Sequence, residues 1–308
     1  MSLSMLNIRE HISLRPYTVF KIGGPALYFC EIQNVEELQE ATRWAEVRTM
    51  PFVILGAGSN VLISDEGYSG LVIRLLMRDI EQRSDDVLHV AAGASMAAVA
   101  HFATTCGLGG FEWAIGIPGT VGGSIFGNAG CYGGEMKDVV ERVNIFDASK
   151  AINYPPERER LERAGKLPTT NCLFSYRYSI FKKHPEWIIV SATLKLVSRD
   201  PIESAALMRE YGKKRATAQD IGSPCAGCIF KNFTPSDGGA KISAGQLIDA
   251  AGLKGTKVGG AMVSFKHGNF IINTGNATAE DVKQLIVLIK EKIKAVHGAE
   301  LEEEIRIL

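Results

Sequence analysis

The sequence lacks an excess of charge of either sign. Its 308 residues contain 34 Lys and Arg against 34 Asp and Glu, which gives a formal net charge of zero. Proteins that bind nucleic acid or anionic membranes through their overall field carry a basic excess, so this balance predicts neither partner. The chain also lacks any apolar run near the roughly 20 residues that a membrane-spanning helix requires. We therefore expect no nucleic-acid or membrane partner.

Cysteine and histidine are few and form no regular ligand pattern. There are six of each, and no His makes a spaced pair with another metal ligand. Met1–Met5 lack the basic region and apolar run of a signal peptide. Together with four thiols scattered among apolar or glycine residues, this predicts a cytoplasmic protein with reduced cysteines. The four are Cys30, Cys106, Cys131 and Cys172.

The composition is that of an ordinary globular protein, with 46% hydrophobic and 22% charged residues. The length favours two domains. We expect a first domain over residues 1–200, with lobes of about 1–76 and 77–200, and a second over 201–308, where the pattern changes. The predicted strands are Ala26–Ile32, Phe52–Leu55, Leu71–Leu76, Val87–Ala91, Val139–Phe146, Trp187–Leu196, Asn269–Ile272 and Leu301–Leu308. The predicted helices follow Asn34, Ser95 and Thr278 or span Ile202–Thr217 and Ala244–Ala251, and the charged run Glu157–Lys166 is interpreted as a solvated face.

Glycine, by contrast, is abundant in one apolar stretch. Eight of the nineteen residues in Gly116–Gly134 are glycine, and the intervening residues include Ile, Val, Phe, Tyr and Pro. A flexible linker would carry polar residues instead. Glycine among apolar residues lets a backbone approach another group closely. The stretch therefore predicts either a binding surface for a large, flat, phosphate-bearing cofactor or a tightly turned piece of core.

A second glycine loop, Gly56–Asn60, follows the predicted strand Phe52–Leu55. Successive backbone N–H groups in such a loop can form an anion-binding nest. The loop lacks the third glycine of the dinucleotide fingerprint and the Gly-Lys-Ser/Thr of a P-loop. It predicts a phosphate contact of another type, or an ordinary turn.

Cys225 and Cys228 form a Cys-x-x-Cys motif with several interpretations. These are a redox disulfide, half of a zinc site, two small residues in a turn, or Cys228 acting alone. Arg177 lies among aromatic residues, where an arginine is either a structural residue or a fork for a substrate carboxylate. Arg215 follows two lysines at a predicted helix end, where a favourable interaction with the helix dipole is one interpretation of these charges.

Seven motifs follow one another along the chain: Tyr17–Pro25, Gly56–Asn60, Gly116–Gly123, Asn128–Gly130, Tyr176–Arg177, Ala226–Asn232 and Asn269–Asn273. In this order they make the chain resemble the MurB family, the UDP-N-acetylenolpyruvoylglucosamine reductases, in its shorter type II form. The resemblance covers about Tyr17 to Leu308.

The resemblance implies an α+β fold: a two-lobed FAD-binding domain of the vanillyl-alcohol-oxidase/PCMH type and a smaller α+β substrate-binding domain. It also implies an oxidoreductase of peptidoglycan synthesis. Non-covalent FAD is reduced by NADPH, and UDP-GlcNAc enolpyruvate then accepts a hydride at C3 and a proton at C2. We expect a monomer and no metal. Two alternatives remain: another FAD-dependent sugar or alcohol oxidoreductase of the superfamily, and a non-enzymatic thiol or metal-binding protein built on Cys225 and Cys228.

The resemblance also assigns site residues. Arg177 aligns with the arginine that stabilises the enolate-like intermediate, Cys228 with the proton donor and Glu304 with an assisting acid. The family usually has serine where this chain has Cys228; a thiol is the stronger acid, and it exposes the site to oxidation. Glu302 and Glu303 beside Glu304 leave the C-terminal register open. The residues assigned to FAD are Gly56, Ala57, Gly58, Ser59, Asn60, Gly116, Ile117, Pro118, Gly119, Thr120, Gly122, Gly123, Asn128, Ala129 and Gly130; those assigned to the UDP-sugar are Lys231, Asn232, His267 and Arg215.

Overall fold

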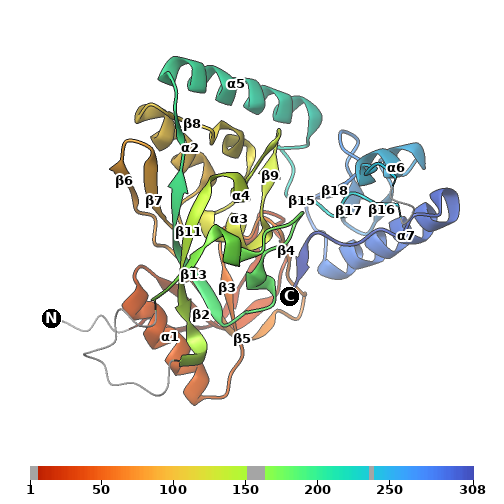
Figure 1. Ribbon diagram of the computed structural model, residues 1–308. Helices are drawn as coiled ribbons and strands as arrows, with labels where there is room; N and C mark the ends of the chain where they lie inside the picture. The colour runs from red at the N-terminus through yellow and green to blue at the C-terminus, as the bar shows by residue number, and fades with distance from the viewer. Residues whose placement is uncertain (1–5, 151–163, 236–238) are drawn as a thin grey trace. The chain divides into compact units, whose positions relative to one another are not determined.

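The computed structural model describes residues 6–150, 164–235 and 239–308 and divides the chain into two compact units. Unit 1 is assembled from Met1–Glu10, Tyr28–Ala57 and Gly70–Lys213. Unit 2 is assembled from His11–Leu27, Gly58–Ser69 and Lys214–Leu308. Both units mix helices and strands, as the α+β prediction requires (Figure 1).

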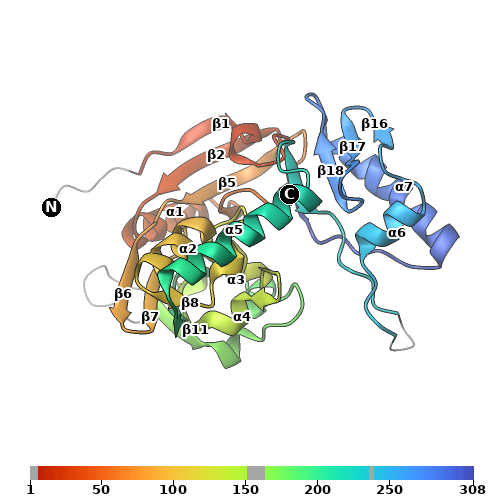
Figure 2. The ribbon, with the colours of Figure 1, turned by 90° about the horizontal axis from the view of Figure 1, so that it is seen from above.

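Unit 1 contains an antiparallel sheet in the order β12-β11-β13-β7-β6 and most of a second sheet, β1-β2-β5-β3. Helices α2 and α5 lie side by side in both views (Figures 1 and 2). The strands are β1 (Arg9–Ser13), β2 (Pro25–Ile32), β3 (Phe52–Leu55), β5 (Tyr68–Leu75), β6 (Ile80–Ser84), β7 (Val87–Ala91), β8 (Leu108–Gly109), β9 (Gly130–Cys131), β10 (Gly134–Glu135), β11 (Val140–Asp147), β12 (Ala164–Pro168), β13 (Trp187–Lys195) and β14 (Val197–Ser198). The helices are α1 (Val35–Val47), α2 (Met96–Thr105), α3 (Val121–Gly127), α4 (Met136–Val139) and α5 (Pro201–Ala218).

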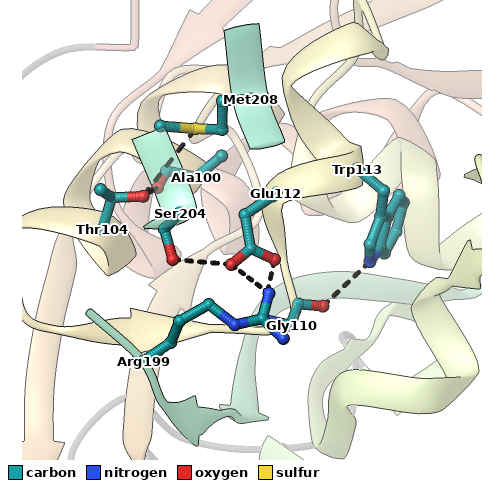
Figure 3. Close-up of polar contacts among 8 residues, drawn as sticks. All are labelled: Ala100, Thr104, Gly110, Glu112, Trp113, Arg199, Ser204 and Met208. Carbon is teal, nitrogen blue, oxygen red and sulfur yellow. Dashed lines mark hydrogen bonds and ion pairs between the residues drawn. The ribbon is translucent and has the colours of Figure 1, made fainter. Parts of the chain in front are cut away.

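A buried carboxylate joins α5 to the segment before the glycine-rich stretch. Glu112 is 5% exposed and accepts hydrogen bonds from Arg199 Nη1 at 2.8 Å, Ser204 Oγ at 2.7 Å and the Gly110 N–H at 2.8 Å (Figure 3). Burial alone would raise the pKa of the Glu112 carboxyl, but these hydrogen bonds and the Arg199 charge outweigh it and lower that pKa. This network fixes the first part of α5 within unit 1, which ends at Lys213.

Unit 2 is built on the sheet β15-β18-β17-β16. Side chains alternate between its two faces. Ala261, Val263 and Ile271 belong to the core formed with α6 and α7, whereas Phe270 and Ile272 pack with Cys225 on the opposite face. The elements are β4 (Val61–Leu62), β15 (Cys225–Cys228), α6 (Ala244–Ala250), β16 (Lys257–Val258), β17 (Ala261–Val263), β18 (Phe270–Asn273), α7 (Ala279–His297) and β19 (Arg306–Ile307).

Two N-terminal segments belong to unit 2 because their side chains complete its core and cap its long helix. Phe20 and Leu62 are fully buried in the cluster that includes α7. The Asp65 carboxylate accepts the N–H groups of Ala279 at 2.8 Å and Glu280 at 3.1 Å, at the start of α7. The compact units therefore do not follow the expected boundary at residue 200.

Most predicted elements are confirmed, including the helices capped by Asn34, Ser95 and Thr278. The predicted strand Leu301–Leu308 is wrong in extent, since only β19 is a strand. The glycine-rich stretch contains the unpredicted helix α3, capped by the Thr120 hydroxyl. Residues 157–163 of the charged run Glu157–Lys166 lie outside the described residues. Its last three residues form the start of β12.

Candidate active site

A cavity of about 340 Å³ in unit 1 brings the two glycine loops together. Gly56 and Ala57 from the end of β3 face Gly119 and Thr120 across it. A Cβ atom on Gly56 would lie 2.6 Å from Thr120 Oγ1, so only glycine allows this approach. The full lining is Gly56, Ala57, Arg74, Leu75, Leu76, Arg78, Gly93, Ala94, Ser95, Ala98, Gly119 and Thr120.

The third wall of this cavity was not predicted. It is the segment Gly93–Ser95, which leads into α2. The backbone of Ala94 accepts the Val121 N–H at 2.9 Å, and Gly119 accepts the Met96 N–H at 3.0 Å, so this segment pairs with the glycine-rich stretch. A run of small residues between a strand and a helix was the available sequence signal. Arg74 and Arg78 also belong to the lining, and Arg74 Nη1 is paired with Glu31 Oε1 at 2.7 Å.

Several glycines of the stretch are explained by packing of the protein against itself. A Cβ on Gly134 would lie 2.2 Å from Trp113 Cδ1, and one on Gly130 would lie 2.5 Å from the Gly134 carbonyl. A Cβ on Gly122 would lie 2.9 Å from Ala92 Cβ. The core interpretation of the stretch therefore holds for these three positions.

The other residues assigned to FAD are not part of this cavity lining in the part of the chain that the structure describes. Gly58, Ser59 and Asn60 belong to unit 2, where Gly58 has φ +64° and would meet Tyr17 O at 2.2 Å if it carried a Cβ. The remainder lie in the glycine-rich stretch of unit 1, at Gly116, Ile117, Pro118, Gly122, Gly123, Asn128, Ala129 and Gly130.

Arg177 occupies the third position of a tight turn in unit 1. Ser175 and Tyr178 exchange two backbone hydrogen bonds of 3.1 Å across the turn. Arg177 has φ +56°, a conformation that costs a side-chain-bearing residue about 1–3 kcal/mol and that glycine usually occupies. Arg177 is therefore a strained position, and its role in the site stays a prediction.

In unit 2, Cys228 lies close to the C-terminal acidic segment. The Glu304 N–H donates to the carbonyl of Ile229, the residue after Cys228, at 2.7 Å, and Phe230 forms a bridge with Glu303. The carboxylates of Glu302 and Glu303 make ion pairs of 2.9 Å with Lys231 and Lys290. Glu302 and Glu303 are thus each held by a lysine of unit 2, and the functional role of Glu304 stays a prediction.

The Cys-x-x-Cys motif forms a bulged strand rather than a turn. Cys225 and Cys228 pair with Ile272 and Phe270, and Gly227 between them has φ +75°. Neither cysteine forms a disulfide, and burial raises the pKa of Cys225. Among the described residues no group of three or more metal-ligating side chains occurs.

The residues assigned to the UDP-sugar also lie in unit 2. Asn232 Oδ1 accepts the Ala244 N–H at 3.3 Å, while Arg215 is close enough to Cys225 to influence its pKa. Burial, followed by the charge of Lys254, lowers the pKa of His267, whose Nδ1 accepts the Asn269 N–H at 3.2 Å. The neutral ring therefore carries its proton on Nε2 and can donate to a ligand.

One residue of this region was not predicted. Asn269 is 2% exposed and bonds both backbone groups of Phe230, accepting from its N–H at 2.9 Å and donating to its carbonyl at 2.7 Å. It fixes the segment that joins Cys228 to Lys231. Its place in a short motif was the only sequence signal.

The C-terminal part of the chain, residues 219–308, matches the family model described as "UDP-N-acetylenolpyruvoylglucosamine reductase, C-terminal domain", and residues 26–151 match that of an FAD binding domain. A relative from Chlamydia trachomatis serovar A, named UDP-N-acetylenolpyruvoylglucosamine reductase, is 40% identical over 302 residues, covering 98% of this chain and 96% of its own. A relative of the same name from Caldanaerobacter subterraneus is 40% identical over 296 residues, covering 96% of this chain and 91% of its own.

The solved MurB structure from Thermus caldophilus superposes with a TM-score of 0.78 at 33% identity, covering 98% of this chain and 99% of its own. Within the described ranges, no helix combines the length and apolar character needed to cross a bilayer.

Proposed function

The chain belongs to the UDP-N-acetylenolpyruvoylglucosamine reductase family of FAD-dependent oxidoreductases, and from this we propose that it reduces UDP-GlcNAc enolpyruvate to UDP-N-acetylmuramate. We further propose that NADPH is the reductant and that the reaction serves peptidoglycan precursor synthesis in the cytoplasm. The observation that carries the proposal is the 40% identity to a named reductase over 98% of this chain, together with the match to an FAD-binding domain.

The cavity of unit 1 suits the diphosphate of FAD. Two arginines and the backbones of three loops line it, and Gly56 lets the first glycine loop approach Thr120 of the second. When bound, FAD supplies hydride chemistry. The role of the residues that line this cavity is to hold the cofactor without covalent attachment and to exclude water from it.

Arg177 acts on the substrate. Addition of a hydride at C3 of the enolpyruvyl group places negative charge on C2 and on the adjoining carboxylate. A guanidinium held in a fixed orientation stabilises that charge as it forms, and its planar fork matches a carboxylate. The strained turn at φ +56° supports this role, because it orients the side chain before the substrate binds.

Cys228 Sγ donates the proton that C2 requires, and Glu304 assists from the adjacent segment. A thiol has a reference pKa of about 8.5 and is a competent general acid near neutral pH. Phe270, Ile272 and Met262 form the apolar surroundings of the Cys225–Cys228 face and limit water there. The hydrogen bond from Glu304 to Ile229 supports their joint action.

The test starts with the absorbance spectrum of the purified protein without oxygen. We expect a bound flavin that NADPH bleaches and that UDP-GlcNAc enolpyruvate reoxidises. An oxidoreductase acting on another sugar or alcohol would be bleached but would not respond to this substrate. A thiol or metal-binding protein would contain no flavin at all.

A further inference from the structure

Asn128 was assigned to the cofactor by resemblance, yet its side chain is fully committed inside unit 1. It is 0% exposed. Its Nδ2 donates to Ser175 O at 2.9 Å and to Glu135 Oε2 at 2.9 Å, and its Oδ1 accepts the Lys137 N–H at 3.0 Å. Both amide hydrogens and the carbonyl are therefore used by the protein.

These bonds reach the turn that carries Arg177. Ser175, whose carbonyl Asn128 holds, lies two residues before Arg177. Ser179, two residues after Arg177, is fully buried and donates its hydroxyl to Phe126 O at 2.7 Å. Phe126 is in the last turn of α3, and Asn128 is the C-cap of the same helix. The end of α3 thus holds the Arg177 turn from both sides.

Charged residues around Asn128 also link it to Arg177. Glu135 accepts from Asn128 and pairs with Lys137 Nζ at 2.9 Å. Despite the effect of burial, hydrogen bonds from Lys137 and Asn128 and the charges of Lys137 and Arg177 lower the pKa of Glu135. The carboxylate is therefore ionised near neutral pH and close enough to Arg177 to attract its guanidinium.

We propose that Asn128 is a positioning residue for Arg177, rather than a cofactor contact: with Glu135 and Ser179 it fixes the strained turn that presents the guanidinium to the substrate. This inference rests on the proposed function, in which Arg177 acts only after the cofactor has been reduced. Loss of Asn128 therefore affects one half of the catalytic cycle and leaves the other intact.

The test measures the two half-reactions of Asn128→Gly separately by stopped flow without oxygen. Glycine suits the φ of +44° at this position, so the variant removes the side chain without backbone strain. We expect the flavin-to-protein ratio and the rate of flavin reduction by NADPH to match the wild type. Reoxidation by UDP-GlcNAc enolpyruvate should slow by about 10- to 100-fold, because a misplaced catalytic group loses its orientation.

Leu173→Gly is the matched control. Leu173 lies two residues before Ser175, in the segment that leads into the Arg177 turn. It has φ +47° and is 57% exposed, so removal of its side chain should leave the rates of flavin reduction and reoxidation unchanged. Ser179→Ala removes the second anchor and should slow reoxidation alone, which tests the inference even if Asn128→Gly does not fold. Loss of flavin, slowed reduction by NADPH, or unchanged reoxidation in the Asn128 and Ser179 variants would overturn it. Failure of the wild type to be reoxidised would instead contradict the proposed function.

Discussion

The backbone N–H of Glu304 donates to the carbonyl of Ile229 at 2.7 Å, which anchors the C-terminal acidic segment directly beside Cys228. This contact joins residues far apart in sequence and places a thiol and a carboxylate in one part of unit 2. The resemblance to the family assigns a role in proton delivery to each of them. The backbone bond beside Cys228 supports a site in which both take part.

Replacing Cys228 by Ala should abolish proton delivery while leaving flavin reduction by NADPH unchanged. We expect reoxidation by the substrate to fall by about 10²–10⁴-fold, the usual contribution of a general acid. Cys228→Ser should retain part of the rate, because the hydroxyl has similar reach. Cys106→Ala, at the C-cap of α2, is the control and should behave as the wild type. Full turnover by Cys228→Ala would remove the thiol from the mechanism.

Arg177→Gly should separate stability from catalysis. Glycine relieves the positive φ of +56°, so the variant should unfold at the same temperature as the wild type or a higher one. Substrate-dependent reoxidation should nevertheless be lost, since no guanidinium stabilises the enolate. Thermal unfolding and stopped-flow absorbance measure the two effects. A marked fall in unfolding temperature would show that the side chain is needed mainly for folding.

Asp65→Ala should destabilise unit 2 although Asp65 is 214 residues before Ala279, the first residue of α7 that it caps. Removing a helix cap costs about 1 kcal/mol of unfolding free energy. Denaturant unfolding measures the loss. Asp65→Asn keeps a side-chain oxygen as acceptor and should lose less. Equal stability of Asp65→Ala and the wild type would contradict the assignment of this segment to unit 2.

Glu112 should make folding sensitive to acid. Its pKa is lowered in the folded protein, so its contribution to stability is present above the usual carboxyl value of 4.5 and is lost as pH falls through the lowered value. Glu112→Gln should therefore cost about 1–3 kcal/mol at neutral pH and less at about pH 4, as measured by urea unfolding. Glu81→Gln, which breaks an exposed pair with Arg83, is the control and should have little effect. A pH-independent difference for Glu112→Gln would contradict the ionised buried carboxylate.

Elements whose stabilising contacts lie within their own segment could be predicted from the sequence. The helix after Thr278 was predictable because its cap and apolar stripe are both local; the structure confirms Thr278 as the cap and adds a capping box with Asp281. Phe20 and Leu62 in the core of unit 2 were not predictable, since their partners lie in the C-terminal half. Asn128 illustrates the limit for the site. Its motif predicted a contact with the cofactor, whereas its hydrogen bonds to Ser175 and Glu135 indicate that it positions Arg177.

The most direct test of the central claim is single turnover of the NADPH-reduced wild type with UDP-GlcNAc enolpyruvate in the absence of oxygen. The proposed reaction predicts recovery of the oxidised flavin spectrum, with one equivalent of product heavier than the substrate by two hydrogen atoms. A flavin that stays reduced, with the substrate mass unchanged, would contradict it.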